Sequence, residues 1–294
     1  MSIFQGSGVA IITPFKNGGA VDFDRLGALI DWQTEQGSDA IVIVGTTGEA
    51  SCLYDDEHLD TIGYAVQRVA GRVPVIAGVG SNQTEHGIKL SRGAQKHGAD
   101  ALLHVTPYYN KASRRGLIEH FTVIADSVDI PILLYSVQGR TGMNLAPDVV
   151  AELAKHPNIV GIKEASGNIA QVAEIARVTP DDFDLYSGND DMIVPLLSLG
   201  GKGVISVLAN IAPKDTHDMV MKFLAGDAEG ARKLQLDLKP LIDALFMEVN
   251  PIPVKAALWL MGKCEYIYRL PLCPMEEGNL EKLKKEMRAQ GLLA

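Results

Sequence analysis

Lys163 is the residue whose position most favours covalent chemistry. It directly follows the apolar segment Ile159-Val160-Gly161-Ile162, which has the composition of a strand buried on both faces. Because side chains alternate along a strand, we expect Ile159 and Gly161 on the same side as Lys163. Burial disfavours an ammonium ion, so the pKa of this lysine should fall from about 10.4 toward about 7. A neutral amine attacks a carbonyl carbon and forms a Schiff base.

Hydroxyl groups follow other apolar segments and favour the same chemistry. Tyr135 ends the segment before that of Lys163, and a phenol can pass protons to and from a forming carbinolamine and imine. Thr46 can connect Tyr135 to a further hydroxyl, for which Tyr109 is a candidate. Taken alone, Lys163 also fits a structural lysine that pairs with an acidic group at a strand end. We expect Glu164 to face away from Lys163 and to be structural.

Two further positions suit the carboxylates of a substrate. Thr47 lies in the turn Gly45-Thr46-Thr47-Gly48-Glu49, where backbone N–H groups can hold one carboxylate. Arg140 lies in Gly139-Arg140-Thr141-Gly142, and its planar guanidinium binds a second carboxylate through two hydrogen bonds. The seven histidines show no metal-ligand spacing. We therefore expect neither a metal nor a cofactor.

Eight short apolar segments must position these groups. They alternate with stretches of helical periodicity such as Phe23-Leu26-Leu29-Ile30, a pattern that requires parallel strands joined by crossovers. A doubly wound sheet would show a glycine fingerprint after its first strand, but Thr13-Pro14-Phe15 stands there. We predict an α/β fold, a (β/α)8 TIM barrel with its functional groups at the carboxyl ends of the strands. The predicted strands are 9–13, 40–44, 73–79, 101–106, 130–137, 159–163, 183–186 and 203–208.

The last part of the chain has only helical periodicity. Residues 228–249, 254–261 and 280–292 are predicted to be helices. No Ser/Gly/Pro-rich linker precedes them, so we expect one unit rather than two independent domains. We predict a catalytic barrel in residues 1–225 and a C-terminal helical extension, packed on it, in residues 226–294.

Composition excludes several classes of protein. The chain has 294 residues, a net charge of -9 and no basic stripe, which argues against nucleic-acid binding. Apolar runs such as Ile41-Val42-Ile43-Val44 are too short to cross a membrane, and residues 1–5 do not resemble a signal peptide. The three cysteines are scattered and have neither disulfide-framework nor zinc-site spacing. We expect a cytoplasmic protein with free thiols.

Seven segments resemble the dihydrodipicolinate synthase family, within the pyruvate-dependent class I aldolase and lyase superfamily. They occur in the family's order and with its spacing, so the resemblance extends over essentially the whole chain. The glycine-flanked Arg140 narrows the resemblance to the synthase branch. The segments are 45–49, 107–111, 139–142, 161–168, 186–190, 203–207 and 250–255.

The resemblance implies a reaction and a proton relay. It implies that pyruvate forms an imine with Lys163 and then condenses with L-aspartate-4-semialdehyde to give 4-hydroxy-tetrahydrodipicolinate. This is the first committed step of diaminopimelate and lysine biosynthesis. The relay implied is Tyr135, Thr46 and Tyr109. In the family, the second tyrosine comes from a neighbouring subunit, so Tyr109 implies a homodimer, usually within a homotetramer.

The resemblance also implies how the substrates are held. Thr47 and the backbone at Ile205 correspond to pyruvate-binding positions, and Gly188 lies at the substrate site. Arg140 corresponds to the site for the carboxylate of aspartate semialdehyde.

Departures from the family pattern concern inhibition by lysine. Where the family shows it, inhibition uses an acidic residue and histidines near the dimer interface. Here His86 stands at the usual acidic position and Asp55 at one histidine position, although His58 and Asn82 are kept. We expect lysine to inhibit weakly or not at all.

Two other functions remain open at this level. One is a sibling lyase that uses the same imine, such as N-acetylneuraminate lyase or a 2-keto-3-deoxy sugar-acid aldolase; Arg140 argues against it. The other is a non-catalytic barrel that binds a carboxylate ligand. Borohydride with pyruvate separates the second from an enzyme, because only an enzyme of this kind gains a stable adduct on Lys163.

Overall fold

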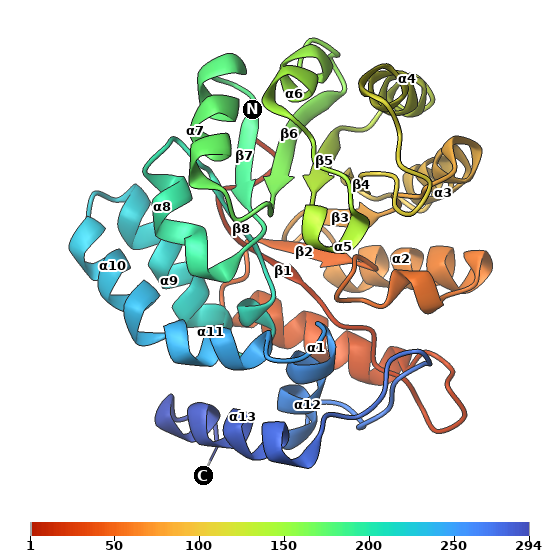
Figure 1. Cartoon of the computed structure of the whole chain (residues 1–294). Coiled ribbons are helices and arrows are strands. Elements are labelled where there is room, and N and C mark those ends of the chain that lie inside the picture. The colour runs from red at the N-terminus through yellow and green to blue at the C-terminus, as the bar shows by residue number, and fades with distance from the viewer. Residues whose placement is uncertain (1, 294) are drawn as a thin grey trace.

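Eight parallel strands form a closed barrel in the computed structural model, which describes residues 2–293. The strands pair in chain order, and β8 closes the barrel against β1 (Figure 1). The predicted α/β barrel is therefore confirmed. The strands are β1 (Gly6–Ala10), β2 (Ala40–Ile43), β3 (Val75–Gly78), β4 (Ala101–Val105), β5 (Ile132–Ser136), β6 (Ile159–Glu164), β7 (Asp184–Ser187) and β8 (Gly203–Ser206).

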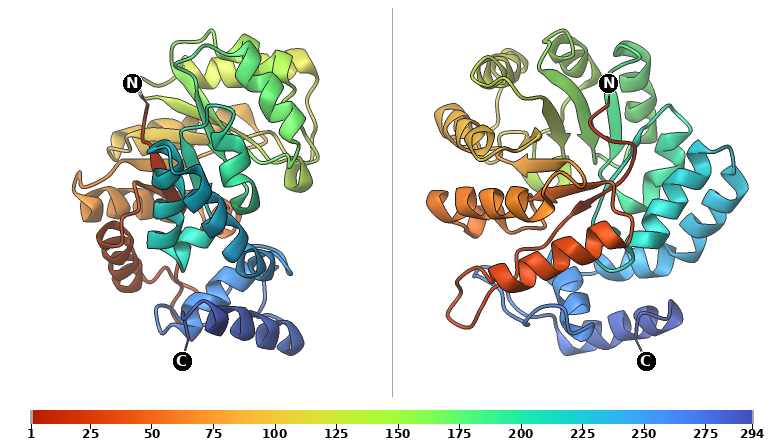
Figure 2. Two further views of the ribbon diagram at one scale, coloured as in Figure 1. Left: turned by 90° about the vertical axis from the view of Figure 1, so that its left-hand side faces the viewer. Right: turned by 180° about the vertical axis from the view of Figure 1, so that it is seen from behind.

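Helices surround the barrel and connect its strands (Figure 2). Between residues 2 and 293, no helix combines the length and the apolar character needed to cross a membrane. The helices of the barrel are α1 (Phe23–Glu35), α2 (Asp55–Val69), α3 (Thr84–Lys96), α4 (Arg114–Ala125), α5 (Gln138–Thr141), α6 (Pro147–Leu153), α7 (Ile169–Val178), α8 (Ile193–Leu197) and α9 (Pro213–Leu224). Short 3-10 turns are η1 (Ala50–Cys52), η2 (Asp190–Met192) and η3 (Leu208–Asn210).

The first strand begins earlier than the predicted segment 9–13. The sequence does not indicate its start, because glycines stand there. Gly6 and Gly8 lower the apparent strand propensity of β1. Tertiary contacts nevertheless require them: a Cβ on Gly8 would lie 2.8 Å from the ring of Phe4, and one on Gly6 would overlap the carboxylate of Asp39. That carboxylate accepts a hydrogen bond of 2.7 Å from the backbone N–H of Ser7.

Apolar side chains form two layers. One fills the inside of the barrel and includes Leu133 and Tyr135, while the other lies between the strands and the helices. Ile159 belongs to the outer layer, whereas its neighbour Val160 contacts the inner one. The expectation that Ile159 shares the side of Lys163 is therefore wrong. The pairing of β5 with β6 shifts register between Ile132 and Leu133, and such an irregularity reverses the alternation of side chains.

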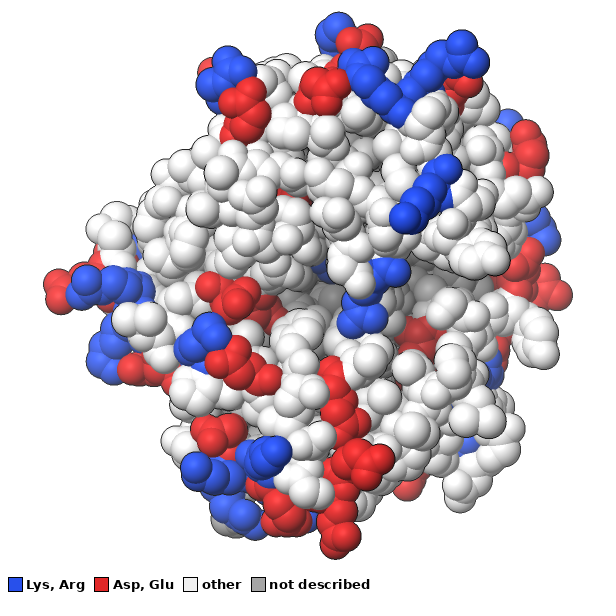
Figure 3. Space-filling view, in the orientation of Figure 1, with Lys and Arg blue, Asp and Glu red and all other residues white. Residues whose placement is uncertain are grey.

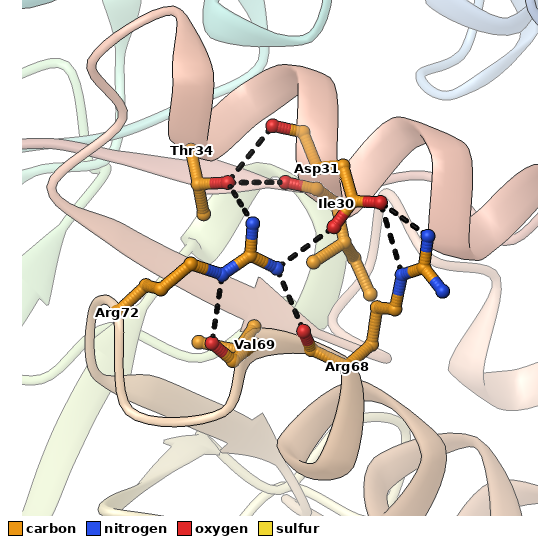
Figure 4. Close-up of polar contacts among 6 residues, drawn as sticks. All are labelled: Ile30, Asp31, Thr34, Arg68, Val69 and Arg72. Atoms are coloured by element: carbon orange, nitrogen blue, oxygen red, sulfur yellow. Dashed lines mark hydrogen bonds and ion pairs between the residues drawn. The ribbon is translucent and has the colours of Figure 1, made fainter.

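Asp31 joins the neighbouring helices α1 and α2. Its carboxylate accepts a hydrogen bond of 3.0 Å from Nε of Arg68 and one of 2.8 Å from Nη2 of Arg72 (Figure 4). Arg72 also donates to the hydroxyl of Thr34 at 2.9 Å. The hydrogen bonds from Arg68, ahead of those from Arg72, lower the pKa of Asp31. Surface pairs of this kind contribute little to stability, so the network mainly sets how the two helices pack.

Four helices follow the barrel: α10 (Ala228–Asp237), α11 (Lys239–Leu245), α12 (Ile252–Leu260) and α13 (Glu277–Ala289). The single helix predicted over 228–249 is wrong, because the chain breaks at Leu238 and restarts with Pro240 in the first turn of α11. Proline has no N–H group and clashes with the preceding helical turn. Helix α10 packs against α9, and α12 contacts η3.

A buried ion pair attaches α12 to the loop after β2. Nζ of Lys255 lies 2.5 Å from Oε1 of Glu49, and both side chains are fully buried. The ammonium also lies 4.1 Å from the ring centroid of Phe15. The guanidinium of Arg269 packs on the same ring at 4.5 Å and donates to Glu57 of α2 at 2.6 Å. Two cations of the C-terminal segment therefore hold the loops after β1 and β2.

Removing the buried cation should destabilise the fold strongly. Lys255→Met leaves the carboxylate of Glu49 buried without its partner, which typically costs about 3 to 5 kcal/mol of unfolding free energy. The measurement is urea unfolding followed by circular dichroism. Lys285→Met is the matched control, since Lys285 is 83% exposed and lies 3.8 Å from Glu286, and it should change stability very little. Equal effects of the two substitutions would contradict a structural role for the buried pair.

Candidate active site

The side-chain amine of Lys163 lies inside the barrel, at the carboxyl ends of the strands. Lys163 is 5% exposed, and its Nζ lies 4.3 Å from the ring centroid of Tyr135 on the neighbouring strand. Burial lowers the pKa of Lys163 to about 7; the charge of Asp190 opposes this shift and that of Arg140 adds to it. The direction of this shift agrees with the prediction and favours the neutral amine.

Tyr135 and Thr46 form a hydroxyl pair beside the lysine. Tyr135 is 6% exposed, and burial raises the pKa of its phenol, while Arg140 and a hydrogen bond with Thr46 lower it. The phenol therefore stays protonated at neutral pH and can give or accept a proton through its hydrogen bond. Two of the three members of the predicted relay lie together within one chain.

The loop that carries Thr46 is held in a strained conformation. Val44 and Glu49, on either side of it, have φ angles of +46° and +55°, which β-branched and long side chains rarely adopt. Gly48 is required between them, since a Cβ there would lie 2.9 Å from Cα of Val44. Such strain persists where the surrounding structure holds it, and here the buried pair of Glu49 with Lys255 does so.

Asn250 links the two predicted carboxylate-binding residues. Its Nδ2 donates a hydrogen bond of 3.0 Å to Oγ1 of Thr47. Its backbone carbonyl accepts a hydrogen bond of 3.0 Å from Nη2 of Arg140. Arg140 lies on α5, a short helical turn that the hydrogen bond from Gly142 N–H to Gln138 closes at 2.9 Å. The guanidinium is thus aimed across the mouth of the barrel.

Gly188 gives Lys163 its space. A Cβ at Gly188 would lie 3.1 Å from Cε and Cγ of Lys163 and 2.7 Å from Cβ of Ala165. Only a glycine fits this place at the end of β7. Ile205, on β8, is fully buried in the inner layer together with Tyr135.

A cavity lies beside Tyr135 at the carboxyl end of the barrel. Its volume is about 550 Å³, and its wall includes Thr46, Asp55, His86, Tyr135 and Arg140. Figure 3 shows that this face of the molecule is hollowed near its centre, with charges of both signs around it. The space is large enough for a small organic acid.

Tyr109 lies outside this cavity. Its side chain is 93% exposed, and its φ angle is +72°. Within one chain the structure therefore does not bring Tyr109 to Tyr135 and Thr46.

Glu164 faces away from Lys163, as expected. Its carboxylate accepts hydrogen bonds of 2.9 Å from Gln171 of α7 and 3.1 Å from the N–H of Ser166. Burial raises the pKa of Glu164. Across residues 2–293, no group of three or more His, Cys, Asp or Glu residues is placed to hold a metal ion.

Sequence reasoning assigned no role to Asn250 or Asp190. Asn250 is 203 residues from Thr47 in the chain, so no local pattern indicated their contact; the proline-rich run after it was the only signal. Asp190 follows the end of β7 and is 2% exposed. An acidic residue just after an apolar strand, at the catalytic end of a barrel, was a usable signal.

The arrangement supports capture of a carbonyl compound that carries a carboxylate. The buried amine of Lys163 lies 4.3 Å from the ring centroid of Tyr135, and the phenol of Tyr135 and the guanidinium of Arg140 line one cavity. The amine can attack a ketone, the phenol can supply and remove protons, and the arginine can orient an anion.

Comparison with known proteins agrees with this geometry. Residues 3–290 match the dihydrodipicolinate synthetase family. The 4-hydroxy-tetrahydrodipicolinate synthase of Caldicellulosiruptor bescii is 60% identical over 292 residues, covering 99% of both chains. A dihydrodipicolinate synthase crystal structure has a TM-score of 0.96 and 48% identity, over 99% of this chain and 100% of the other. The Cyanidioschyzon merolae enzyme, with lysine bound, has a TM-score of 0.97 and 42% identity over 100% of both chains. The chain belongs to the dihydrodipicolinate synthetase family.

Proposed function

We propose that this chain is a Schiff-base-forming lyase that condenses pyruvate with L-aspartate-4-semialdehyde to give 4-hydroxy-tetrahydrodipicolinate. The observation that carries the proposal is the buried Lys163, whose pKa is lowered to about 7 and whose Nζ lies 4.3 Å from the ring centroid of Tyr135, a residue of the cavity wall. Relatives across the whole chain bear the name of this synthase. Neither a sugar-acid lyase nor a non-catalytic barrel is favoured by them.

The first step is attack of Nζ of Lys163 on the ketone carbon of pyruvate. The ketone oxygen leaves as water after two protonations, for which Tyr135 and Thr46 are placed, and a protonated imine remains. Loss of a methyl proton gives an enamine, whose carbon attacks the aldehyde of the second substrate. The substrate's amino group then attacks the imine carbon, closes the ring and releases Lys163 as the free amine.

Tyr109 is proposed as the third member of the relay, supplied by a second copy of the chain. Its 93% exposure and its absence from the cavity wall within one chain support this role. A homodimer that inserts this tyrosine beside Thr46 completes the site, and we propose that two such dimers form a homotetramer.

Four residues are proposed to hold the substrates: Thr47, Ile205, Gly188 and Arg140. Thr47 and the backbone at Ile205 bind the carboxylate side of pyruvate, and Gly188 leaves the space for its imine with Lys163. Arg140 binds the carboxylate of aspartate semialdehyde. Its position at the cavity wall and its anchoring to Asn250 support this assignment.

Residues 226–294 are proposed as an extension that belongs to the catalytic barrel of residues 1–225 rather than a separate domain. The contacts of Lys255 and Asn250 with the loop after β2 support this division.

We further propose a cytoplasmic location, which the free thiols of the three cysteines support.

Weak inhibition by lysine is also proposed, because the acidic group near the cavity already has a cationic partner. Nζ of Lys89 lies 2.6 Å from Oδ2 of Asp55, and Nε2 of His86 lies 2.9 Å from Oδ1. These contacts, that of Lys89 first, lower the pKa of Asp55. The ammonium of a free lysine would have to compete with Lys89 for the same carboxylate.

Borohydride trapping tests the proposed function. Pyruvate with borohydride should leave one stable adduct on Lys163, located by mass spectrometry of peptides. Lys163→Arg should abolish the adduct and reduce turnover by at least about a thousandfold, because a guanidinium stays charged and is not nucleophilic. Lys202→Arg is the control and should keep both, because Lys202 directly precedes β8 and so lies at the opposite end of the barrel from Lys163. A label on another residue, or full turnover by Lys163→Arg, would overturn the mechanism.

Arg140→Gln should shift the pH dependence of imine formation upward. The positive charge of Arg140 lowers the pKa of Lys163, so its removal should raise that pKa and leave less neutral amine at pH 7. The rate of pyruvate trapping, measured from pH 5 to pH 10, should then rise around a higher midpoint than about 7. The KM for aspartate semialdehyde should also increase, by about tenfold or more for a lost charge-assisted pair. An unchanged midpoint would show that this arginine does not act on the lysine.

Lysine should have little effect on turnover. Titration of L-lysine during the condensation should show no strong inhibition at sub-millimolar concentrations, because Lys89 already neutralises Asp55. Binding measured by calorimetry, with the Cyanidioschyzon merolae enzyme as the positive control, should agree. Strong inhibition at sub-millimolar lysine would refute the proposal.

A further inference from the structure

Formation of the imine places a positive charge where the barrel is most buried. A neutral amine and a ketone combine with one proton and release one water, and the resulting iminium carries a full charge on Nζ of Lys163. Lys163 is 5% exposed, and a charge in such surroundings is costly unless an opposite charge lies near. This question rests on the proposed function, since it concerns the intermediate that the function requires.

The groups acting on Lys163 come from three neighbouring elements. The ring of Tyr135, from β5, lies 4.3 Å from Nζ. Arg140, from α5, has the same sign of charge and repels an iminium, while Asp190, from η2, has the opposite sign. Glu164 is adjacent on β6, but its carboxylate faces Gln171 and Ser166. Of the carboxylates of residues 2–293, the one acting on the lysine is that of Asp190.

Asp190 is held in place by the backbone that follows β8. Its Oδ2 accepts hydrogen bonds of 2.8 Å from the N–H of Leu208 and 3.1 Å from that of Val207, and the hydroxyl of Ser206 also bonds to it. The backbone at the end of β7 lies against the side chain of Lys163, since a Cβ on Gly188 would be 3.1 Å from Cε of Lys163. The carboxylate is thus fixed and does not need to move when the imine forms.

The second carboxylate oxygen has no hydrogen-bond partner in the described chain. Oδ1 of Asp190 is buried, and no group of the described chain forms a hydrogen bond with it. Every hydrogen bond to the carboxylate is donated by its partner, which suits the ionised form. Burial raises the pKa of Asp190, while the charge of Lys163 lowers it. The ionised form is therefore favoured most when the lysine carries its charge.

We propose that Asp190 is the counter-ion that stabilises the protonated imine formed on Lys163. It is a positioning residue that acts through the lysine. Its backbone contacts hold it in place, and its unpaired oxygen leaves a negative charge available to the iminium. Arg140 and Asp190 act on one amine with opposite signs, so the protonation of the imine depends on their balance.

Asp190→Asn separates charge from anchoring. The amide oxygen of asparagine can still accept the two N–H bonds of Oδ2, and its amino group takes the place of the unpaired Oδ1. The measurement is the pH dependence of pyruvate trapping by cyanoborohydride, which reduces the protonated imine. The midpoint of this pH dependence should fall by about one pH unit or more, because a nearby negative charge raises the pKa of an amine and the substitution removes that charge. This shift is opposite to the one expected for Arg140→Gln. The Kd for pyruvate at pH 8 should rise about tenfold.

Matched variants identify the cause. Glu164→Gln removes a buried carboxylate adjacent to Lys163 that faces away from it, and should leave the midpoint unchanged. Asp190→Ala removes both charge and anchor. If Asp190 only anchors the backbone after β8, Asp190→Ala should impair the enzyme while Asp190→Asn keeps the original midpoint of the pH dependence. This outcome would overturn the proposal.

A measurement on the unaltered protein keeps the proposal testable if the variants do not fold. Protein labelled with nitrogen-15 at lysine Nζ is combined with pyruvate, and the nitrogen chemical shift reports the protonation of the imine. A shift typical of a protonated imine across pH 6 to 9 supports an ionised counter-ion; a neutral imine across that range refutes it. If pyruvate does not label Lys163 at all, the proposed function fails instead.

Discussion

Desolvation of one amine is the constraint on which the rest of this site depends. Lowering the pKa of Lys163 from 10.5 to about 7 corresponds to roughly 4 to 5 kcal/mol against the charged form. An open strand end exposed to water does not produce such a shift. The closed barrel does, because the inner apolar layer, with Tyr135 and Ile205, excludes water around the lysine. Closure of the sheet and nucleophilicity of the amine are therefore linked.

The loops around the amine are held by residues from the end of the chain. Lys255 pairs with Glu49, Asn250 contacts Thr47 and Arg140, and Arg269 bonds to Glu57. The strained turn after β2 keeps its geometry because these contacts hold it from the outside. Residues that never approach the reacting atoms thus set the positions of those that do.

Electrostatics at the site results from a small number of local charges rather than from the net charge of -9. Arg140 and Asp190 change the pKa of Lys163 in opposite directions. The amine is free to attack when neutral, and the same pair of charges acts on it again when it becomes an iminium. In the same cavity wall, Asp55 pairs with Lys89 and is hydrogen-bonded to His86, so that carboxylate offers little to another cation.

The local sequence pattern determined the barrel and the hydroxyls at the strand ends. It also determined the inward position of Lys163 and the outward position of Glu164, because apolar runs and the alternation of side chains reflect burial within a few residues. It misplaced β1, where Gly6 and Gly8 serve tertiary contacts, and Ile159, where the register shifts. The contacts of Asn250 and Asp190, and the exposure of Tyr109, were decided by tertiary structure alone. Pairing register and contacts between residues far apart in the chain depend on which surfaces meet after folding, and no local spacing records that.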